Sequence, residues 1–453
     1  MVAKNKEITR RNFLKESATV AGAGLGAMIL SSRILNAAVP PSDRITVGYI
    51  GVGARAQQIM DSMLEIPGME ITKVCDAYKG RVARAIERCK GKPKAVDNYR
   101  QILEDKSIDA VVVATPDHWH KKMCIDAVQS GKDVYCEKPL TYTVDEGLEI
   151  ISAVKSTGRI FQVGSQGISS KVQRKARDVI ASGKLGQITM IRAYFNRNTA
   201  GGAWIYPIPP DANPQTVNWE MFLGPAPKVA FSLPRFFRWR CYKDYSGGIS
   251  TDLFVHLCTT IHFLMAVDAP AQVMGMGDLY RWRSSRDVPD TINASLKYKE
   301  GFMVNMAGTF NNTMSSGSGF QILGTEGSLE IGYRGLTFYP ETPVEDDRWV
   351  VRSWSSELEK AYYADPKWIA YETGAKAREA ANKPEKLFET IEEEDSTKAH
   401  LEHWLDCIRS RTSSEENAEV GHRACAVAHM VNRSIETGNS VYWDFENQRI
   451  KTY

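Results

Sequence analysis

Two ionisable side chains stand four residues apart in a segment that the sequence predicts to be a helix. Asp252 and His256 follow the pair Gly247-Gly248. On an α-helix, residues four apart share one face, so the two side chains could converge on a single substrate hydroxyl. Imidazole, with an ordinary pKa of about 6.5, is suited to accept a hydroxyl proton at neutral pH. The spacing is therefore compatible with acid–base catalysis, although most Asp–His pairs of this kind are surface or structural contacts. The apolar stripe that would pack this helix consists of Leu253, Leu257, Ile261 and Leu264.

A lysine in the first half of the chain is a candidate for the same chemistry. Lys138 lies in Glu137-Lys138-Pro139, directly after a short apolar segment at 133–136. Its ammonium group could donate to a substrate oxygen and stabilise negative charge that develops there as the hydroxyl proton leaves. A lysine before proline in a loop is more often a solvated charge. Whether it meets Asp252 and His256 depends on the elements that carry all three.

The first of these elements predict a dinucleotide site. A β-prone segment at 45–50 runs into Gly51-Val52-Gly53-Ala54-Arg55-Ala56, and an amphipathic helix follows. This is G-x-G-x-x-A between a strand and a helix, the arrangement in which backbone amides and the helix N-terminus hold a pyrophosphate. Gly51 permits the turn, and Gly53 allows close approach of the phosphates. We expect Gly51, Gly53, Ala54 and Arg55 to contact the cofactor; a phosphate-free unit of the same fold is the alternative.

A carboxylate after the second strand selects between the two nicotinamide cofactors. Asp76 ends the predicted strand at 70–75 and lies 20 residues past Ala56. A carboxylate at this distance accepts hydrogen bonds from ribose hydroxyls and repels a 2′-phosphate. The sequence therefore favours NAD over NADP. Arg81 is close enough to keep NADP as the alternative.

Two loops should meet beside the nicotinamide. The apolar run at 110–114 has the composition of a parallel strand buried on both faces, and a strand at 133–136 follows it after a helix. Ligands of such sheets bind beyond the carboxyl ends of the strands. His118 and His120 have no carboxylate or cysteine spaced for a metal site, so we expect no metal, and His120 either caps its helix or borders the pocket. The loop residues expected at the cofactor are Thr115, Pro116, His120, Glu137 and Lys138.

The second half of the chain is predicted to form a sheet that is interrupted by an irregular insertion. Alternating strands are predicted at 188–196, 272–280, 291–298, 302–310 and 320–323, and helices at 397–410 and 418–436. Between the first of these strands and the Asp252 helix, residues 201–245 are rich in aromatic and arginine side chains. Such side chains suit sugar recognition, but each one could equally pin a long loop onto the sheet.

Taken together, these motifs resemble the Gfo/Idh/MocA oxidoreductases, a family that includes glucose–fructose oxidoreductase and inositol dehydrogenase. The resemblance rests on Gly51–Ala56, Asp76, ATPDHWH at 114–120, EKPLT at 137–141 and GGISTDLFVH at 247–256. It implies an α/β protein with an NAD-binding Rossmann domain (42–165) and an α+β substrate domain (166–395) built on a large, mostly antiparallel open sheet. Residues 396–453 would pack back on the Rossmann domain. The resemblance also implies catalytic roles for Lys138, Asp252 and His256.

Composition excludes several other classes of protein. The 453 residues carry 57 basic and 54 acidic side chains, a net charge of +3, which gives no general reason to bind nucleic acid. The eight cysteines include no CxxC pair, so neither a disulfide framework nor a zinc cage is indicated.

The first 38 residues are predicted to be a twin-arginine signal peptide. Arg10-Arg11 precedes an apolar run from Ala18 to Leu30, and Ala37 and Ala38 offer a cleavage point. The run has 13 residues, fewer than the roughly 20 needed to span a bilayer, so stable membrane insertion is not expected. A chance arginine pair before an amphipathic helix is the alternative. We expect export of the folded protein by the twin-arginine machinery to the periplasm.

An exported enzyme would have to keep its nicotinamide bound and regenerate it in place. We therefore expect a periplasmic NAD-dependent oxidoreductase that acts on a sugar or sugar derivative. An NAD-dependent glycoside hydrolase or lyase using transient substrate oxidation is the second hypothesis, and a non-catalytic sugar or NAD sensor is the third. An uncovered sheet face would favour a homo-oligomer. The sequence does not identify the sugar or the carbon oxidised.

Overall fold

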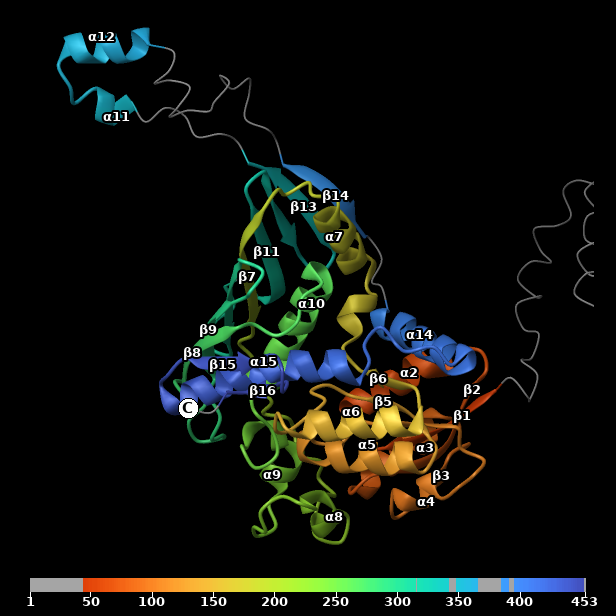
Figure 1. Ribbon diagram of the computed structural model, residues 1–453. Helices are drawn as coiled ribbons and strands as arrows, with labels where there is room; N and C mark the ends of the chain where they lie inside the picture. Colours follow the sequence, from red (N-terminus) through yellow and green to blue (C-terminus); the bar gives the residue numbers. More distant parts are fainter. Residues whose placement is uncertain (1–43, 315, 342–347, 366–383, 391–394, 452–453) are drawn as a thin grey trace, which may run out of the picture. The chain divides into compact units, whose positions relative to one another are not determined.

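The computed structural model describes residues 44–314, 316–341, 348–365, 384–390 and 395–451. The predicted signal peptide and most of the polar stretch around 364–386 lie outside the described residues. From Ile45 onward the chain is organised around two β-sheets (Figure 1). Within the described ranges, no helix is both long enough and apolar enough to cross a membrane.

The first sheet has six parallel strands in the order β3-β2-β1-β4-β5-β6, which is the doubly wound order of a Rossmann domain. Alternate residues of β4 enter two different cores: Val111 and Val113 face one, and Ala110 and Val112 face the other. Both faces of the strand are therefore buried, as its unbroken apolar sequence predicts. The strands are β1 (Ile45–Ile50), β2 (Met69–Cys75), β3 (Lys94–Ala95), β4 (Ala110–Val113), β5 (Asp133–Cys136) and β6 (Phe161–Val163).

Helices cover both faces of this sheet. On one face α5 and α6 pack against each other, and on the other α2 packs against the C-terminal helix α14 (Figure 1). The short 3-10 turn η3 (Asp117–Trp119) begins the loop that follows β4. The helices are α2 (Ala54–Leu64), α3 (Lys79–Arg88), α4 (Arg100–Leu103), α5 (His120–Gln129), α6 (Glu146–Thr157) and α14 (Ser396–Ser410).

The second sheet has ten strands in the order β14-β13-β12-β11-β7-β10-β9-β8-β15-β16. Only the neighbours β7 and β10 run parallel, so the expectation of a large, mostly antiparallel sheet is confirmed. The strands are β7 (Ile188–Asn196), β8 (Gln272–Asp278), β9 (Thr291–Lys297), β10 (Met303–Thr309), β11 (Gly317–Gly324), β12 (Gly327–Ile331), β13 (Gly335–Pro340), β14 (Glu385–Glu389), β15 (Val441–Asp444) and β16 (Arg449–Ile450).

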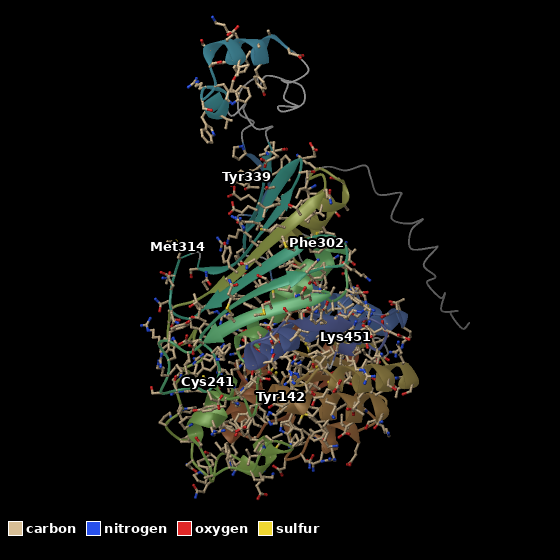
Figure 2. All side chains as sticks on the ribbon, turned by 60° about the vertical axis from the view of Figure 1, so that its left-hand side comes forward. Tyr142, Cys241, Phe302, Met314, Tyr339 and Lys451 are labelled. Carbon is tan, nitrogen blue, oxygen red and sulfur yellow. The ribbon has the colours of Figure 1, made fainter. Side chains whose placement is uncertain are left out.

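One face of this sheet is packed and the other is open. The helices α7 (Lys171–Ala181), α10 (Val255–Met265) and α15 (Ala418–Thr437) lie along the packed face (Figure 1). Figure 2 shows the side chains of the strands, with Phe302 beside β10 and Tyr339 on β13. On the open face, Met274, Met276 and Met303 are exposed.

The last segment of the chain contributes to both sheets. The division made from the sequence assigns 396–453 to packing on the nucleotide-binding domain. In the structure α14 packs on α2, whereas α15 contacts β6 and α6 on one side and β8 and α10 on the other. Strands β15 and β16 extend the second sheet. The C-terminal helices therefore pack on the nucleotide-binding domain, and α15, β15 and β16 also contact the second sheet.

Candidate active site

The turn between β1 and α2 has the geometry of a pyrophosphate cradle. Gly51 has φ +84°, and a Cβ there would lie 2.6 Å from the carbonyl oxygen of Ala114, so no other residue fits without strain. Gly53 is the N-cap of α2, and no side chain caps this helix end. A Cβ on Gly53 would meet only the Arg81 guanidinium, at 3.9 Å, so the backbone is open to a ligand. The unsatisfied amides of such a helix end bind anions.

Asp76 stands at the end of β2 with its carboxylate already oriented. Its two oxygens accept hydrogen bonds from the backbone amides of Val52, at 2.8 Å, and Tyr78, at 2.9 Å. Arg81 lies 3.9 Å from the carboxylate and rests over the rings of Phe236 and Phe237, each at 5.2 Å. A fixed acceptor at this position fits the ribose hydroxyls of NAD.

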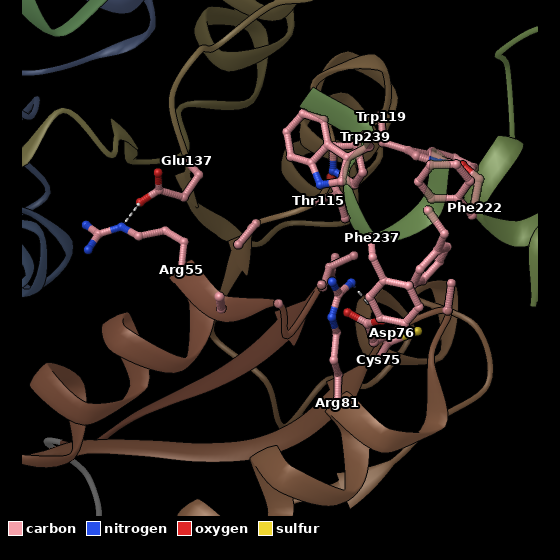
Figure 3. A pocket seen from close by; sticks show the side chains of 18 of the residues that line it. Arg55, Cys75, Asp76, Arg81, Thr115, Trp119, Glu137, Phe222, Phe237 and Trp239 are labelled. Atoms are coloured by element: carbon pink, nitrogen blue, oxygen red, sulfur yellow. Dashed lines mark hydrogen bonds and ion pairs between the residues drawn. The ribbon is translucent and has the colours of Figure 1, made fainter. Parts of the chain in front are cut away.

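A cavity of about 380 Å³ connects this turn with the two loops beyond β4 and β5. Figure 3 shows Arg55 directed toward Glu137, with 3.0 Å between Nε and Oε1, and Arg81 beside Asp76 and Phe237. The structure thus gathers nine of the ten residues expected at the cofactor around one cavity. They are Gly51, Gly53, Ala54, Arg55, Asp76, Thr115, Pro116, Glu137 and Lys138.

The tenth residue, His120, lies behind the cavity and does not line it. Its ring nitrogens are 2.7 Å from the carbonyl oxygen of Pro139 and 2.9 Å from that of Thr115, and the side chain is buried. Its expected contact with the cofactor therefore stays a prediction. His120 joins the loop after β4 to the loop after β5, because each ring nitrogen contacts one of them.

Lys138 and Asp252, 114 residues apart in the chain, form a close ion pair. Lys138 Nζ is 2.9 Å from Asp252 Oδ1 and 2.8 Å from the backbone oxygen of the same residue. Arg240 Nε also donates to Oδ1, at 2.8 Å. Although burial opposes ionisation, the two cations hold the pKa of Asp252 well below its ordinary value. Asp252 therefore positions Lys138.

The Asp252–His256 spacing does not lie on regular α-helix. Residues Ser250–Phe254 form a π-helical turn, and α10 begins at Val255. Because π-helical hydrogen bonds span five residues, a separation of four no longer guarantees a common face. Asp252 is buried between Lys138 and Arg240, whereas His256 borders a second cavity. The expectation of a shared α-helical face is therefore wrong in its geometry, although the charge of Lys138 acts on both residues.

His256 lies in a positively charged environment. Burial, the ammonium group of Lys138 and the guanidinium groups of Arg55 and Arg197 all lower its pKa, and the Asp252 carboxylate only partly opposes them. The imidazole is consequently neutral at physiological pH. A neutral imidazole can accept a proton, which is the state that a general base needs.

Two charged residues beside this pair were not expected from the sequence. Arg240 was noted only as one member of the aromatic-rich stretch, yet it shares the Asp252 carboxylate with Lys138. The sequence predicts no role for Asp117, but this residue is 2% exposed and its Oδ2 has no hydrogen-bond partner among the described residues. Burial raises the pKa of Asp117 to about 7, although Arg240 opposes the rise. No spacing rule links either residue to Asp252.

The aromatic stretch at 201–245 divides into two groups. Trp204 is buried against Phe310, with ring centroids 4.8 Å apart, and Trp219 stacks on Phe222 at 5.1 Å. These rings pin the stretch to the body of the protein. Tyr206, Trp239 and Arg240 instead line the first cavity near Lys138. The sugar-recognition hypothesis therefore stays open for these three side chains.

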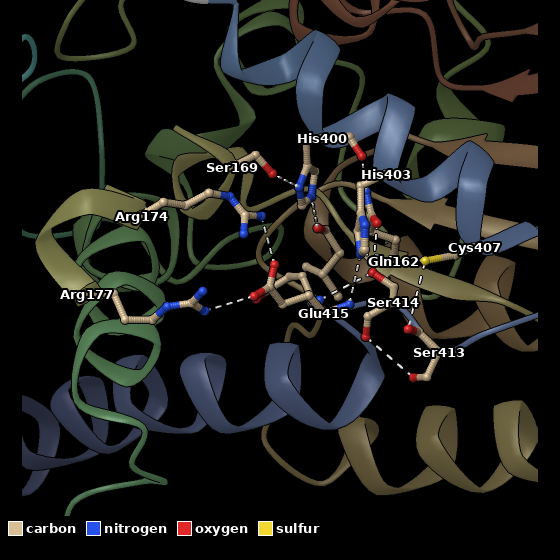
Figure 4. A network of polar contacts seen from close by, with 12 residues as sticks. Gln162, Ser169, Arg174, Arg177, His400, His403, Cys407, Ser413, Ser414 and Glu415 are labelled. Atoms are coloured by element: carbon tan, nitrogen blue, oxygen red, sulfur yellow. Dashed lines mark hydrogen bonds and ion pairs between the residues drawn. The ribbon is translucent and has the colours of Figure 1, made fainter. Parts of the chain in front are cut away.

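The second cavity, of about 340 Å³, lies between α10, the loop after β6, strand β7 and the turn that joins β12 to β13. His256 lines it. The loop after β6 is held in place by His400 of α14, whose ring nitrogens are 2.8 Å from the Val163 carbonyl oxygen and 2.9 Å from Ser169 Oγ (Figure 4). Arg174 and Arg177 of α7 both bond Glu415 in the same network. The loop after β6, which lines one side of the cavity, is therefore fixed in position.

In the part of the chain that the structure describes, no three His, Cys, Asp or Glu side chains converge in a way that could hold a metal ion. His118, whose role was left open, contacts the backbone oxygen of Phe222 through Nε2 at 3.0 Å. Burial lowers its pKa to about 4. His118 is therefore a neutral packing residue in this geometry.

Comparison with protein families identifies both halves of the chain. Residues 45–165 match the model described as "Oxidoreductase family, NAD-binding Rossmann fold", and residues 173–330 match the "GFO/IDH/MocA C-terminal domain". The chain belongs to the GFO/IDH/MocA oxidoreductase family. Its first domain is accordingly an NAD-binding Rossmann domain, in agreement with the glycine turn and Asp76. When NAD is bound, Gly51, Gly53, Asp76 and the two loops are the groups placed to hold it.

Individual relatives of this GFO/IDH/MocA protein are distant. It is 24% identical to 1,5-anhydro-D-fructose reductase of Ensifer adhaerens over 301 residues, which are 65% of this chain and 77% of the reductase. It is 32% identical to an α-N-acetylgalactosaminidase of Shewanella oneidensis over 172 residues, 33% of this chain and only 38% of that enzyme.

Solved structures share the fold at low identity. Levoglucosan dehydrogenase, in a complex with NADH and levoglucosan, matches with a TM-score of 0.65 and 17% identity. The aldose–aldose oxidoreductase of Caulobacter crescentus, complexed with glycerol, matches with a TM-score of 0.63 and 17% identity. Each match covers 88% of this chain and 99% of the other. At these identities the likeness establishes the fold alone.

Proposed function

We propose that this GFO/IDH/MocA protein is an exported, NAD-dependent oxidoreductase that acts on a hydroxyl carbon of a sugar or sugar derivative. The observation that carries the proposal is the contact between Lys138 and Asp252, at 2.9 Å, at the end of a cavity that begins at the nucleotide-binding turn. This contact holds the Lys138 ammonium group at the place where the loops after β4 and β5 meet. His256 lies two residues past the π-helical turn that carries Asp252.

The three residues can divide the acid–base work of alcohol oxidation. His256, neutral at physiological pH, accepts the proton of the substrate hydroxyl. Lys138 donates a hydrogen bond to the same oxygen and stabilises the negative charge that develops on it. Asp252 keeps Lys138 in place, and Arg240 fixes Asp252 from the other side. NAD, when bound, supplies the acceptor for the hydride that leaves the substrate carbon.

Sugar as the substrate class is supported by two independent observations. The relatives and structural neighbours include enzymes named for anhydrofructose, levoglucosan and aldoses. In this chain, Tyr206, Trp239 and Arg240 line the cavity beside Lys138. Aromatic rings stack on the C–H faces of sugars, and guanidinium groups bond their hydroxyls.

Turnover of the bound cofactor tests the proposal. The purified protein is expected to carry a nicotinamide nucleotide, identified by the mass of the released compound. Adding sugars from a panel should produce the near-ultraviolet absorbance of reduced nicotinamide with at least one of them. Lys138→Ala and His256→Ala should abolish this signal while the nucleotide stays bound, because the glycine turn and Asp76, which are placed to hold the pyrophosphate and the ribose, are unchanged in both variants. The exposed Lys155→Ala serves as the control; full activity in Lys138→Ala would contradict the proposal.

Redox-assisted glycoside hydrolysis is the second candidate. It is supported by the alignments with glycosyl hydrolase family 109 proteins and with the α-N-acetylgalactosaminidase, although these span 38% of the relatives' length. The readout is release of nitrophenol from nitrophenyl α-N-acetylgalactosaminide by the NAD-loaded protein. Release without net accumulation of reduced nicotinamide would favour the hydrolase, and its absence across a panel of nitrophenyl glycosides would favour the oxidoreductase.

Export adds a requirement for cofactor retention. Arg10-Arg11 and the apolar run that follows support a twin-arginine signal, and Arg10→Lys with Arg11→Lys should then prevent appearance of the protein in the periplasm.

A complex with a Kd of about 1 nM and an association rate of about 10⁶ M⁻¹s⁻¹ loses its ligand in minutes to tens of minutes. We therefore expect release slower than this, and a redox cycle that regenerates NAD on the enzyme.

Assembly into a homo-oligomer is also part of the proposal. The exposed methionines Met274, Met276 and Met303 on the open sheet face support it, since apolar side chains grouped on one surface favour association. Light scattering on the purified protein measures the state directly. A strict monomer at micromolar concentration would contradict this part and leave the rest unaffected.

A further inference from the structure

The second cavity, which His256 borders, carries positive charge that no acidic side chain among its described lining residues matches. Its lining includes Arg197 and Arg334, and none of the described residues around it is an aspartate or glutamate. Hydroxyl and amide side chains make up most of the remaining polar surface. A cavity with this composition attracts an anion that also carries hydrogen-bonding groups.

Arg197 has the geometry to bind such an anion with two parallel hydrogen bonds. It directly follows β7, and its backbone amide donates to Thr309 at 2.8 Å, which fixes its position at the end of the sheet. The guanidinium lies 4.7 Å from the centre of the Phe195 ring, and only Nη1 is occupied, by a long contact of 3.4 Å to the Gly202 carbonyl oxygen. Among the described residues, Nε and Nη2 have no partner and no carboxylate pairs with this side chain. The Nε–Nη2 edge matches the two oxygens of a carboxylate or phosphate.

Arg334 adds a second cation at the mouth of the same cavity. It lies on the turn between β12 and β13, is exposed, and has no ion pair within the described part of the chain. Because water screens an exposed charge, its contribution to affinity should be smaller than that of Arg197.

Unpartnered polar atoms inside the cavity indicate a ligand with hydroxyl groups. Thr259 on α10 is 2% exposed, and its Oγ1 has no hydrogen-bond partner in the described structure. Gln166 Oε1 in the loop after β6 is likewise buried without a partner. Both residues line the cavity. A buried polar atom without a partner is unfavourable, so a ligand that satisfies these two atoms would be stabilised here.

We propose that this cavity binds the anionic part of an acidic sugar, whose carboxylate or phosphate group is held by Arg197 and whose hydroxyls bond Thr259 and Gln166, while the carbon to be oxidised lies at His256 and reaches toward Lys138 of the first cavity. This rests on the proposed function, because His256 is taken to act on the same molecule. It narrows the substrate class from sugars in general to sugars that bear an anionic group. A bound anion would also offset the positive charge that Lys138 and Arg197 place around His256.

The test compares acidic and neutral sugars on the NAD-loaded protein. Calorimetry gives the Kd of D-glucuronate, D-glucose 6-phosphate and D-glucose, and absorbance reports reduction of the nicotinamide by each. At least one of the acids is expected to bind about 10-fold or more tightly than glucose, as for a hydrogen-bonded charge pair. Which acid shows the preference distinguishes a carboxylate from a phosphate ligand.

Substitution of the arginines assigns the preference to the cavity. Arg197→Gln should reduce the ratio of acidic to neutral affinity by about 10-fold and Arg334→Gln by about 3-fold. The matched control is Arg192→Gln, on the same strand as Phe195 but exposed and outside both cavities, which should leave the ratio unchanged.

The outcomes separate this inference from the proposed function. Reduction of nicotinamide by neutral sugars, with glucose bound as tightly as both acids, would overturn the inference and leave the oxidoreductase standing. Tighter binding of acidic than of neutral sugars that is lost in Arg197→Gln, without any reduction of nicotinamide, would support the cavity assignment and contradict the proposed oxidoreductase activity. No binding of either acid, or a preference that survives Arg197→Gln, would also overturn the inference.

Discussion

Charge at the active site is arranged so that each residue is held in a useful protonation state. Asp252 accepts hydrogen bonds from both Lys138 and Arg240, which favour its ionised form. The ionised carboxylate in turn fixes the Lys138 ammonium at the end of the nucleotide cavity. His256 is kept neutral by burial and by the same positive charge. The buried carboxylate therefore fixes the hydrogen-bond donor, and the charge of that donor helps to keep the proton acceptor neutral.

The first prediction concerns the acid limb of the activity profile. Because burial and Lys138 lower the pKa of His256, the base form persists below the ordinary imidazole pKa of about 6.5. Activity is present above the pKa of His256 in the free enzyme and is lost as the pH falls through it. We expect kcat/KM for sugar oxidation to be maintained at pH 6 and to decline only in more acidic buffer. A limb centred above pH 6.5 would contradict the assignment of His256 as the base.

A second prediction uses the buried carboxyl of Asp117. Its pKa rises from 3.8 to about 7 in the folded protein, so the folded state binds a proton that the unfolded state releases between these values. Stability from this group is therefore complete below pH 4 and is lost as the pH rises through 7. Asp117→Asn should raise the free energy of unfolding by about 1 to 3 kcal/mol at pH 8 and by little at pH 4.

Urea unfolding of both proteins at the two pH values measures this difference. Asp178→Asn, at an exposed position on α7, is the control and should change stability little at either pH. An equal effect of Asp117→Asn at pH 4 and pH 8 would show that ionisation of this group is not the cause.

Residue types and short spacings were enough to predict the nucleotide site, because its parts follow one another in the chain. Gly51 and Gly53 lie in one turn, and the strand pattern places Asp76 and the loops after β4 and β5 at the same sheet edge. Arg240 could not be found in this way. It belongs to an irregular stretch, and only the folded path of that stretch brings it to Asp252.

At the scale of elements, the helix that carries the catalytic residues begins abnormally. The turn Ser250–Phe254 is π-helical, and it follows Gly248, which has φ +72°. Periodicity in the sequence predicted this helix correctly but assumed α-helical geometry from its start. The apolar stripe of α10 is the same for either start, so the pattern contains no signal for the π-turn.

The third prediction tests the glycine that precedes this turn. A Cβ on Gly248 would lie 2.9 Å from Val288 Cβ, and its backbone conformation is unfavourable for other residues. Gly248→Ala should therefore lower the free energy of unfolding by about 2 to 4 kcal/mol and reduce kcat, because Asp252 N donates to Gly248 O at 3.0 Å. Urea unfolding and initial rates provide the two readouts.

Gly438→Ala is the matched control for that substitution. Gly438 also has positive φ, +66°, at the C-terminus of α15, but nothing lies within 4 Å of a Cβ there. Gly438→Ala should lower the free energy of unfolding by about 1 kcal/mol, from backbone conformation alone, and leave kcat unchanged. If the two variants had equal effects on stability and rate, the clash between the Cβ introduced at position 248 and Val288 would not be the cause of the loss.

At the scale of the whole molecule, α15 connects the two sheets and also supports the catalytic turn. Asn432 in its middle donates from Nδ2 to the Gly247 carbonyl oxygen at 2.9 Å, and its Oδ1 accepts a hydrogen bond from Ser250 Oγ. Neither contact was predicted, since a residue 180 positions later carries no local signal for its partner. The helix thus holds the start of the π-turn from outside it.

The fourth prediction assigns Asn432 a positioning role. Asn432→Ala should lower kcat by about 10- to 100-fold, because a shift of the turn moves Asp252 and with it Lys138. The KM for the sugar and the affinity for NAD should change little, as Asn432 touches neither cavity. Steady-state kinetics and a nucleotide titration separate these quantities. Arg433→Ala, at the next, exposed position, is the control; a kcat equal to wild type in Asn432→Ala would contradict the role.

The central position of β7 in the ten-stranded sheet has a consequence for synthesis on the ribosome. Both of its neighbours, β10 and β11, lie more than about 100 residues later in the chain. At a translation rate of roughly 5–20 residues per second, the nascent strand waits on the order of 5 to 20 s for partners. During that time its backbone amides and apolar side chains are unpaired, so we expect nascent chains that end between 200 and 300 to be the ones that chaperones capture.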